Sequence, residues 1–208
     1  MMRMRVALLA ALMVFGAAAC SPKGGGGAAL TQDDMDQGNP KAKVTVVEYA
    51  SVACPGCAKF NNDSWADIKK TYIDTGKARW VVKEMLTHRP DWAAAGFLTA
   101  RCLGKDKYFE AIDAMYHAQP EIDASGDVKG GLKKIANKFG MSDKDFEACV
   151  GDEAALAAMN DRIEKAARED KIGSTPTFII NGVVFEDEPT TAKIGAAIDA
   201  AAAKAKGK

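Results

Sequence analysis

Two cysteines separated by two residues stand where a strand-like segment gives way to a helical one. Residues 44–50 form a continuous apolar run rich in β-branched side chains, which is typical of a buried central strand. Cys54-Pro55-Gly56-Cys57 follows, and residues 59–74 then have the pattern of a helix. Residues 78–85 predict a second strand. This order predicts one strand–helix–strand unit with the cysteine pair at its first junction.

A pair placed in this way is typical of a redox site. Cys54 is expected at the helix N-terminus, where free N–H groups and the helix dipole favour a thiolate. Pro55 fits the first turn because that position needs no N–H donor. Cys57, one turn later, can resolve a mixed disulfide formed by Cys54. The competing interpretation is half of a zinc site completed by Cys102 and Cys149, but the strand-then-helix context and the signs of export disfavour it.

The rest of the chain divides into a helical part and a second set of strands. Residues 88–172 carry apolar side chains at helical spacing, and Ser142 is the expected N-cap of one helix. Residues 177–180 and 183–185 predict two strands joined by the hairpin signal Asn181-Gly182. An amphipathic helix follows. The fold class is therefore α/β, with a helical insertion between a strand–helix–strand half and a strand–strand–helix half.

The first 38 residues predict export and attachment rather than a folded part of the domain. Residues 1–19 combine two arginines, an apolar run of about a dozen residues and small residues at the end, which is typical of a signal peptide. Cys20 follows at once, as in the bacterial lipoprotein signal that this segment resembles, and a glycine-rich tether would span 20–38. A plain secretory signal is the alternative. The domain would then cover 39–208, outside the cytoplasm, where disulfides persist.

Composition excludes several other classes of function. Twenty-eight basic and 28 acidic residues give a net charge of zero, so nothing favours a nucleic-acid partner. Only two histidines are present, which disfavours a histidine-rich metal site. We expect neither a metal nor a cofactor.

Two further features are unusual for a plain structural domain. Glu48 lies inside the apolar strand six residues before Cys54, where burial would raise its pKa and suit it to accept a proton from Cys57. A glutamate at a strand end that reaches solvent is the alternative. Pro176 stands at the start of a predicted strand, a position where proline is tolerated.

Four ordered motifs together resemble the DsbA-like branch of the thioredoxin superfamily, over about residues 38–200. The motifs are Glu48-Tyr49-Ala50-Ser51, Cys54-Pro55-Gly56-Cys57, Tyr72-Ile73-Asp74-Thr75-Gly76-Lys77 and Thr175-Pro176-Thr177-Phe178. The resemblance implies a thioredoxin fold with a helical insertion at about 88–172 and a cis peptide at Thr175-Pro176. It further implies that this loop binds the substrate backbone beside Pro55 and Gly56, that Cys54 is the exposed nucleophile, and that Lys83 pairs with Glu48.

The remaining cysteines resemble a second pair found in some DsbA-like proteins. Cys102 and Cys149 are each expected on the apolar face of an insertion helix, joined by a structural disulfide. Two separate buried thiols are the alternative. In the chain-entropy model, closing a loop of this size contributes ~4 kcal/mol.

The resemblance implies a periplasmic thiol–disulfide oxidoreductase that introduces or exchanges disulfides in exported proteins. A membrane redox partner would recycle the active-site pair, a lipid on Cys20 would anchor the chain, and the protein would act as a monomer. Strong oxidants of the family often have histidine where this chain has Gly56, so we expect a weaker oxidant. An isomerase or reductase kept reduced by a membrane partner is the alternative, and a non-catalytic tethered binding module is a third hypothesis.

Overall fold

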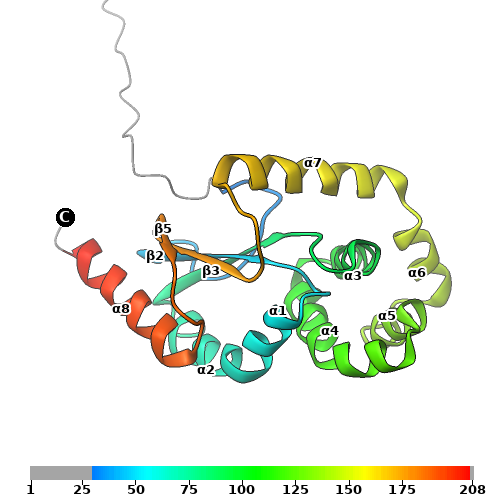
Figure 1. Ribbon diagram of the computed structural model, residues 1–208, viewed down its shortest axis with the longest axis horizontal. Helices are drawn as coiled ribbons and strands as arrows, with labels where there is room; N and C mark the ends of the chain where they lie inside the picture. Colours follow the sequence, from blue (N-terminus) through cyan, green and yellow to red (C-terminus); the bar gives the residue numbers. More distant parts are fainter. Residues whose placement is uncertain (1–29, 207–208) are drawn as a thin grey trace, which may run out of the picture.

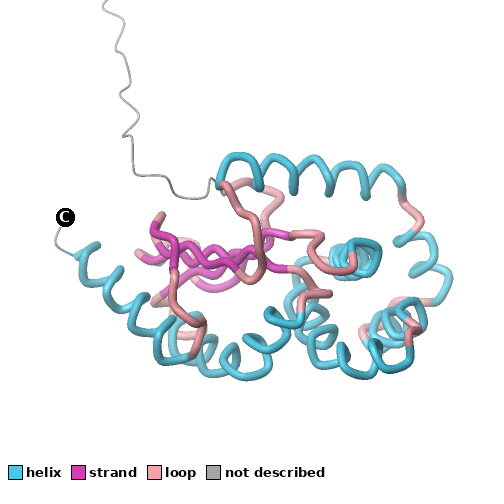
Figure 2. The backbone as a smooth tube through the Cα atoms, viewed as in Figure 1, coloured by secondary structure: helices cyan, strands magenta, loops and turns pink. Residues whose placement is uncertain are grey.

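The computed structural model describes residues 30–206, which form a mixed sheet surrounded by helices (Figures 1 and 2). The strand order is β1-β3-β2-β4-β5, in which β2 and β3 are parallel and the other neighbours are antiparallel. Every side chain of the central strand β2 is buried except that of Thr45, which is half-buried. The strands are β1 (Met35–Gly38), β2 (Val44–Ala50), β3 (Ala78–Glu84), β4 (Thr177–Ile180) and β5 (Val183–Phe185).

Helices cover both faces of the sheet. An almost continuous helical run follows the cysteine pair and lies on one face with α8, whereas α7 crosses the opposite face (Figure 1). Alternate residues of β2 separate these two layers: Val46 and Ala50 contact the larger core, and Val47 and Tyr49 face α7. The helices are α1 (Pro55–Phe60), the π-helical η1 (Asn61–Trp65), α2 (Ala66–Ile68), η2 (Lys69–Ile73), α7 (Glu153–Asp170) and α8 (Thr191–Lys206).

The insertion between β3 and β4 is helical, as its periodicity predicts. It consists of α3 (Pro90–Cys102), α4 (Lys105–Ser125), α5 (Val128–Lys138), α6 (Asp143–Val150) and α7. Ser142 caps α6 by accepting a hydrogen bond from the Asp145 N–H, so the predicted cap is confirmed. Within residues 30–206, no helix combines the length and apolar character needed to span a membrane.

Cys102 and Cys149 are joined by a disulfide, with an S–S distance of 2.10 Å. The bond links the last residue of α3 to α6 and leaves neither sulfur free to serve as a zinc ligand. Cys149 is buried, but Cys102 is exposed, which differs from the expectation that both lie on apolar helix faces. Cys102 is the last residue of α3, beyond the buried residues of that helix, which end at Ala100.

The folded domain begins before residue 39, within the segment expected to be a tether. Met35–Gly38 forms β1, an edge strand paired antiparallel with β3. The buried side chain of Met35 and an ion pair between Asp36 and Arg79, 2.7 Å apart, hold it in place. A short strand with no β-branched residue lacks the sequence signal on which strand prediction depends. Residues 1–29, including the predicted signal peptide and Cys20, lie outside the described residues.

Candidate active site

Cys54 lies at the N-terminus of α1, immediately beyond the sheet. It is the N-cap residue, with extended backbone angles (φ −84°, ψ 121°), and Pro55 opens the first helical turn. Its thiol donates to the carbonyl oxygen of Thr175 across 3.3 Å. The sulfur is therefore turned inward and Cys54 is only 1% exposed, which corrects the expectation of an exposed nucleophile. Pro55 and Gly56, between the two cysteines, are the exposed part of the motif.

The Thr175–Pro176 peptide bond is cis and lies directly beside the cysteine pair. A β-carbon at Gly56 would lie 3.1 Å from Pro176 Cδ and 3.7 Å from Cys54 Sγ. A contact of 3.1 Å is tight, so a larger residue at this position would require the cis-proline loop to shift slightly away from the helix. A groove of about 260 Å³ opens beside this contact, with Gly56, Phe60, Pro176 and Glu188 among its lining residues.

Hydroxyl groups connect the cis-proline loop to the loop that precedes Cys54. Thr87, just after β3, shares a hydrogen bond with Thr175 between their Oγ1 atoms, 2.6 Å apart. The Ser51 hydroxyl donates to the Thr87 carbonyl across 3.1 Å, and its oxygen accepts from the Ala53 N–H across 3.3 Å. Three segments far apart in the sequence are thus held together around Cys54.

The two cysteines are free thiols with opposite electrostatic properties. A hydrogen bond from Cys57, with further ones from the Thr175 side chain and the N–H groups of Cys57 and Gly56, lowers the pKa of Cys54 to about 5 against the opposing effect of burial. Burial raises the pKa of Cys57 well above its usual value of 9.0, as do the hydrogen bond to Cys54 and the nearby charges of Glu48 and Cys54. Cys54 is therefore the thiolate at neutral pH, and Cys57 keeps its proton.

Glu48 lies beneath the pair, enclosed in the core at 6% exposure, so its side chain does not reach solvent. The indole Nε1 of Trp80 donates to its Oε2 across 3.0 Å. Burial raises the pKa of Glu48 to about 7, partly opposed by the Trp80 hydrogen bond and assisted by the charge of Cys54. A carboxyl group with this pKa can exchange a proton near neutral pH.

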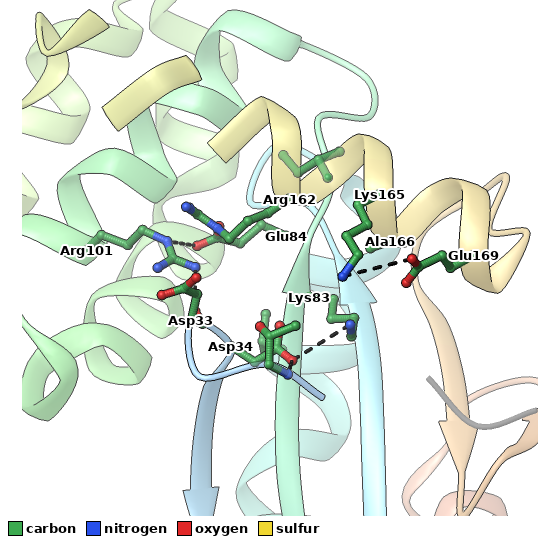
Figure 3. A pocket seen from close by; sticks show the side chains of 12 residues that line it. Asp33, Asp34, Lys83, Glu84, Arg101, Arg162, Lys165, Ala166 and Glu169 are labelled. Carbon is green, nitrogen blue, oxygen red and sulfur yellow. Dashed lines mark hydrogen bonds and ion pairs between the residues drawn. The ribbon is translucent and has the colours of Figure 1, made fainter. Parts of the chain in front are cut away.

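Lys83 occupies a different site from the one that the resemblance implied. Glu48 is paired with Val82 in the β2–β3 register, so Lys83, one residue further along, points to the opposite face of the sheet. There its Nζ lies 3.7 Å from Asp34 Oδ2, in a charged pocket beneath α7 (Figure 3). The partner that Glu48 has in the structure is Trp80.

The same pocket contains a buried carboxylate, Glu84, that ties the insertion to the sheet (Figure 3). Glu84 Oε1 accepts from Arg101 Nε across 2.6 Å and from the Tyr108 hydroxyl across 3.0 Å, and Arg162 Nη2 lies 3.5 Å from Oε2. These groups come from β3, α3, α4 and α7, so they stabilise the scaffold rather than the reacting sulfurs. Among the described residues, no cluster of three or more His, Cys, Asp or Glu side chains could hold a metal.

The profile of a thioredoxin family matches residues 30–200. The chain belongs to the thioredoxin family. Two proteins similar to this chain come from Rickettsia, and both are named protein-disulfide oxidoreductases. The protein of Rickettsia bellii is 29% identical over 180 residues, covering 86% of this chain and 68% of the relative. That of Rickettsia conorii is 32% identical over 155 residues, covering 74% of this chain and 55% of the relative, so this chain spans little more than half of the latter's length.

The fold of this thioredoxin-family chain is DsbA-like. It resembles the crystal structure of α-DsbA1 from Wolbachia pipientis with a TM-score of 0.76 and 23% identity, covering 85% of this chain and 94% of that one. This likeness concerns the fold, whereas the relatives are named for an activity. The chain is a DsbA-like thiol–disulfide oxidoreductase of the thioredoxin superfamily.

Three residues at the site were not found from the sequence: Trp80, Thr87 and Gln119. Trp80 precedes Val82 by two residues in β3 and therefore shares the face that carries Glu48, so strand alternation could have placed it. Thr87 and Gln119 lie in a loop and an insertion helix, and their contacts with the cysteine loop depend on how the insertion packs.

Proposed function

We propose that this thiol–disulfide oxidoreductase works outside the cytoplasm and donates its Cys54–Cys57 disulfide to exported proteins. The observation that carries the proposal is the asymmetric pair, in which Cys54 is stabilised as a thiolate at the start of α1 and Cys57 holds its proton. A reduced form stabilised in this way gives up electrons reluctantly, so its disulfide is a good oxidant.

In the first step, a thiolate of the substrate attacks Cys54 Sγ of the oxidised enzyme. A mixed disulfide forms, the Cys54–Cys57 bond breaks, and Cys57 leaves with the electron pair. Glu48, protonated below a pKa of about 7, then supplies the proton that the buried Cys57 sulfur requires. We assign the cis-proline loop at Thr175 and Pro176, with Pro55 and Gly56, to binding the substrate backbone during this step.

In the second step, another substrate thiolate attacks the substrate sulfur of the mixed disulfide. The Cys54 sulfur leaves as a thiolate, for which its pKa of about 5 makes it a good leaving group. The substrate has lost two electrons and gained a disulfide, and the enzyme has gained two electrons as the reduced pair. A membrane redox partner would reoxidise the pair, with the Glu48 carboxylate accepting the Cys57 proton.

The redox potential of the pair tests the direction of transfer. A chain lacking residues 1–20 would be equilibrated in glutathione buffers and its thiols trapped and weighed by mass spectrometry. We expect a potential towards the oxidising end of the family range, about −120 mV, although less oxidising than that limit because Gly56 offers no side chain to the thiolate. A potential near about −270 mV would overturn the oxidase role and favour a reductase or isomerase.

We also propose that Cys20 carries a lipid and that the glycine-rich segment tethers the domain to a bacterial membrane. The sequence of residues 1–27 supports this proposal, since a small-residue signal end, a cysteine and a glycine run follow one another. Expression with labelled palmitate should give a labelled, membrane-bound product, and Cys20→Ala should be released in soluble form. Equal release of both chains would contradict the anchor.

A further inference from the structure

One side chain of the insertion contacts the backbone of the loop that carries the nucleophile. Gln119, on α4, is 4% exposed. Its amide nitrogen Nε2 lies 2.6 Å from the carbonyl oxygen of Val52 and 3.2 Å from that of Cys54. The side-chain amide of Gln119 thus donates one hydrogen bond to each of the two carbonyls that flank Ala53.

The same loop is seated on a second insertion helix. A β-carbon at Gly96 of α3 would lie 2.6 Å from Cγ2 of Val52, so the valine packs against bare helix backbone. Val52 is fully buried, and its carbonyl is held by α4 while its side chain is held by α3. The insertion therefore fixes the cysteine loop both by packing and by hydrogen bonds.

The carbonyl of Cys54 connects this contact to the thiol. Besides Gln119, it accepts the Ala58 N–H across 3.1 Å, which is the first backbone hydrogen bond of α1. The orientation of this carbonyl and the direction of the Cys54 side chain follow from the same backbone angles. A change in the position of the carbonyl would move the sulfur relative to the N–H groups of Gly56 and Cys57.

We propose that Gln119 is a positioning residue for the reaction: by holding the carbonyls of Val52 and Cys54, it keeps the Cys54 sulfur directed at the N–H groups that open α1. The helical insertion then has a direct part in setting the reactivity of the nucleophile. The proposal rests on Cys54 being the attacking and leaving sulfur, and it holds for either direction of electron transfer.

The test is the pH profile of Cys54 in the full-length reduced chain carrying Gln119→Met or Gln119→Leu. Methionine is close to glutamine in length but donates no hydrogen bond, and leucine removes the donor with a shorter side chain; neither adds a charge. The control is Thr99→Val, which removes a buried hydroxyl of the same insertion that bonds only to Ala95 within α3. Thiolate absorbance and the rate of alkylation at Cys54 would be followed from pH 4 to 9.

We expect both Gln119 variants to shift the Cys54 profile upwards by about one pH unit, a tenfold change in its ionisation equilibrium. Alkylation at pH 5 would then fall about fivefold, while the rate at pH 8, where the thiol is ionised in every variant, would change less than twofold. Thr99→Val should keep the wild-type profile. Unchanged profiles in the Gln119 variants, or an equal shift in Thr99→Val, would overturn the proposal.

The unmodified protein supplies a test that does not depend on the variants folding. The side-chain amide protons of Gln119 should change their NMR shift with the same midpoint as Cys54 ionisation, because one of them bonds to the carbonyl of that residue. An amide signal that does not follow Cys54 would overturn the proposal. A reducing equilibrium potential would instead contradict the oxidase role and leave the positioning role intact.

Discussion

Glu48 is a carboxyl group enclosed by apolar side chains beneath a reactive cysteine pair. Phe178 lies beside it on β4 and Val82 on β3, and the Trp80 indole donates a hydrogen bond to it. A carboxyl group in such surroundings is more stable protonated than charged, which is the state that a buried proton donor needs. Because ionising Glu48 is unfavourable in the folded protein, its protonation state affects the free energy of unfolding.

This link predicts a pH dependence of stability that Glu48→Gln removes. Because the pKa rises from 4.5 in the unfolded chain to about 7 in the folded one, the Glu48 contribution is fully present below pH 4.5 and is lost as pH rises through 7. The loss amounts to roughly 3 kcal/mol. Urea unfolding of the reduced protein at pH 4.5 and pH 8 would measure it as a difference between wild type and variant. A constant difference would contradict the assignment.

A second prediction concerns the resolving cysteine. Cys57→Ala should raise the pKa of Cys54 above about 5, because the largest cause of its depression is the hydrogen bond from Cys57. The variant should also accumulate mixed disulfides with substrates, since no internal thiol can release them. Thiolate absorbance and non-reducing gel shifts would measure the two effects, with Cys54→Ala as the control that forms no mixed disulfide.

The sequence was sufficient to predict the place of single residues when that place depended on position along one element. A glutamate in an apolar strand and a cysteine at a helix start are local features, and both lie where they were expected. The predicted pairing of Lys83 with Glu48 was wrong because side chains alternate along β3, and Lys83 points to the face opposite Glu48. The Cys54 sulfur lies beside Thr175, 121 residues later in the chain, and no local pattern predicts that contact.

At the scale of elements, the insertion is held together by one covalent link between α3 and α6. Its partners are 47 residues apart in sequence. Replacing both Cys102 and Cys149 with alanine should lower the free energy of unfolding by about 4 kcal/mol in the chain-entropy model. Denaturant unfolding at constant redox state would measure the change.

The same double replacement should leave the potential of the Cys54–Cys57 pair within about 15 mV of its original value, since neither helix end contacts the reacting sulfurs. A larger change would indicate that the disulfide, and not only the packing of α3 and α4, supports the active-site loop. The matched control is the folded wild-type chain in the same glutathione buffers.

Most elements were predictable because their apolar periodicity is strong. The strand Val44–Ala50 and the hairpin strands have the bounds that their composition indicated. The strand Met35–Gly38 was missed because it is short, polar and stabilised by pairing with β3 and by the Asp36–Arg79 ion pair, neither of which is a local property. The π-helical segments within the helix after Cys57 likewise have no simple sequence pattern.

For the whole molecule, the proposed oxidase role predicts a stability that changes with the redox state of the active site. An oxidant must be more stable with the pair reduced, because the folded protein favours that form over the disulfide. We expect the midpoint of thermal unfolding to be higher for the reduced than for the oxidised protein. Each 30 mV by which folding raises the potential corresponds to about 1.4 kcal/mol of this difference. A lower midpoint for the reduced form would indicate a reductant.

Under the proposed oxidase role, the disulfide between Cys102 and Cys149 makes the chain a substrate of the reaction that its own site performs. Four cysteines within the domain can pair in three ways, and only one pairing leaves Cys54 and Cys57 together. Since Cys102 is exposed at the end of α3, a neighbouring mature copy can reach it. An older, oxidised copy can therefore pass its Cys54–Cys57 disulfide to the Cys102–Cys149 pair of a newly made one, and is itself left reduced. Such a transfer moves a disulfide between copies without creating one, so the two disulfides of every new molecule come in the end from an outside oxidant.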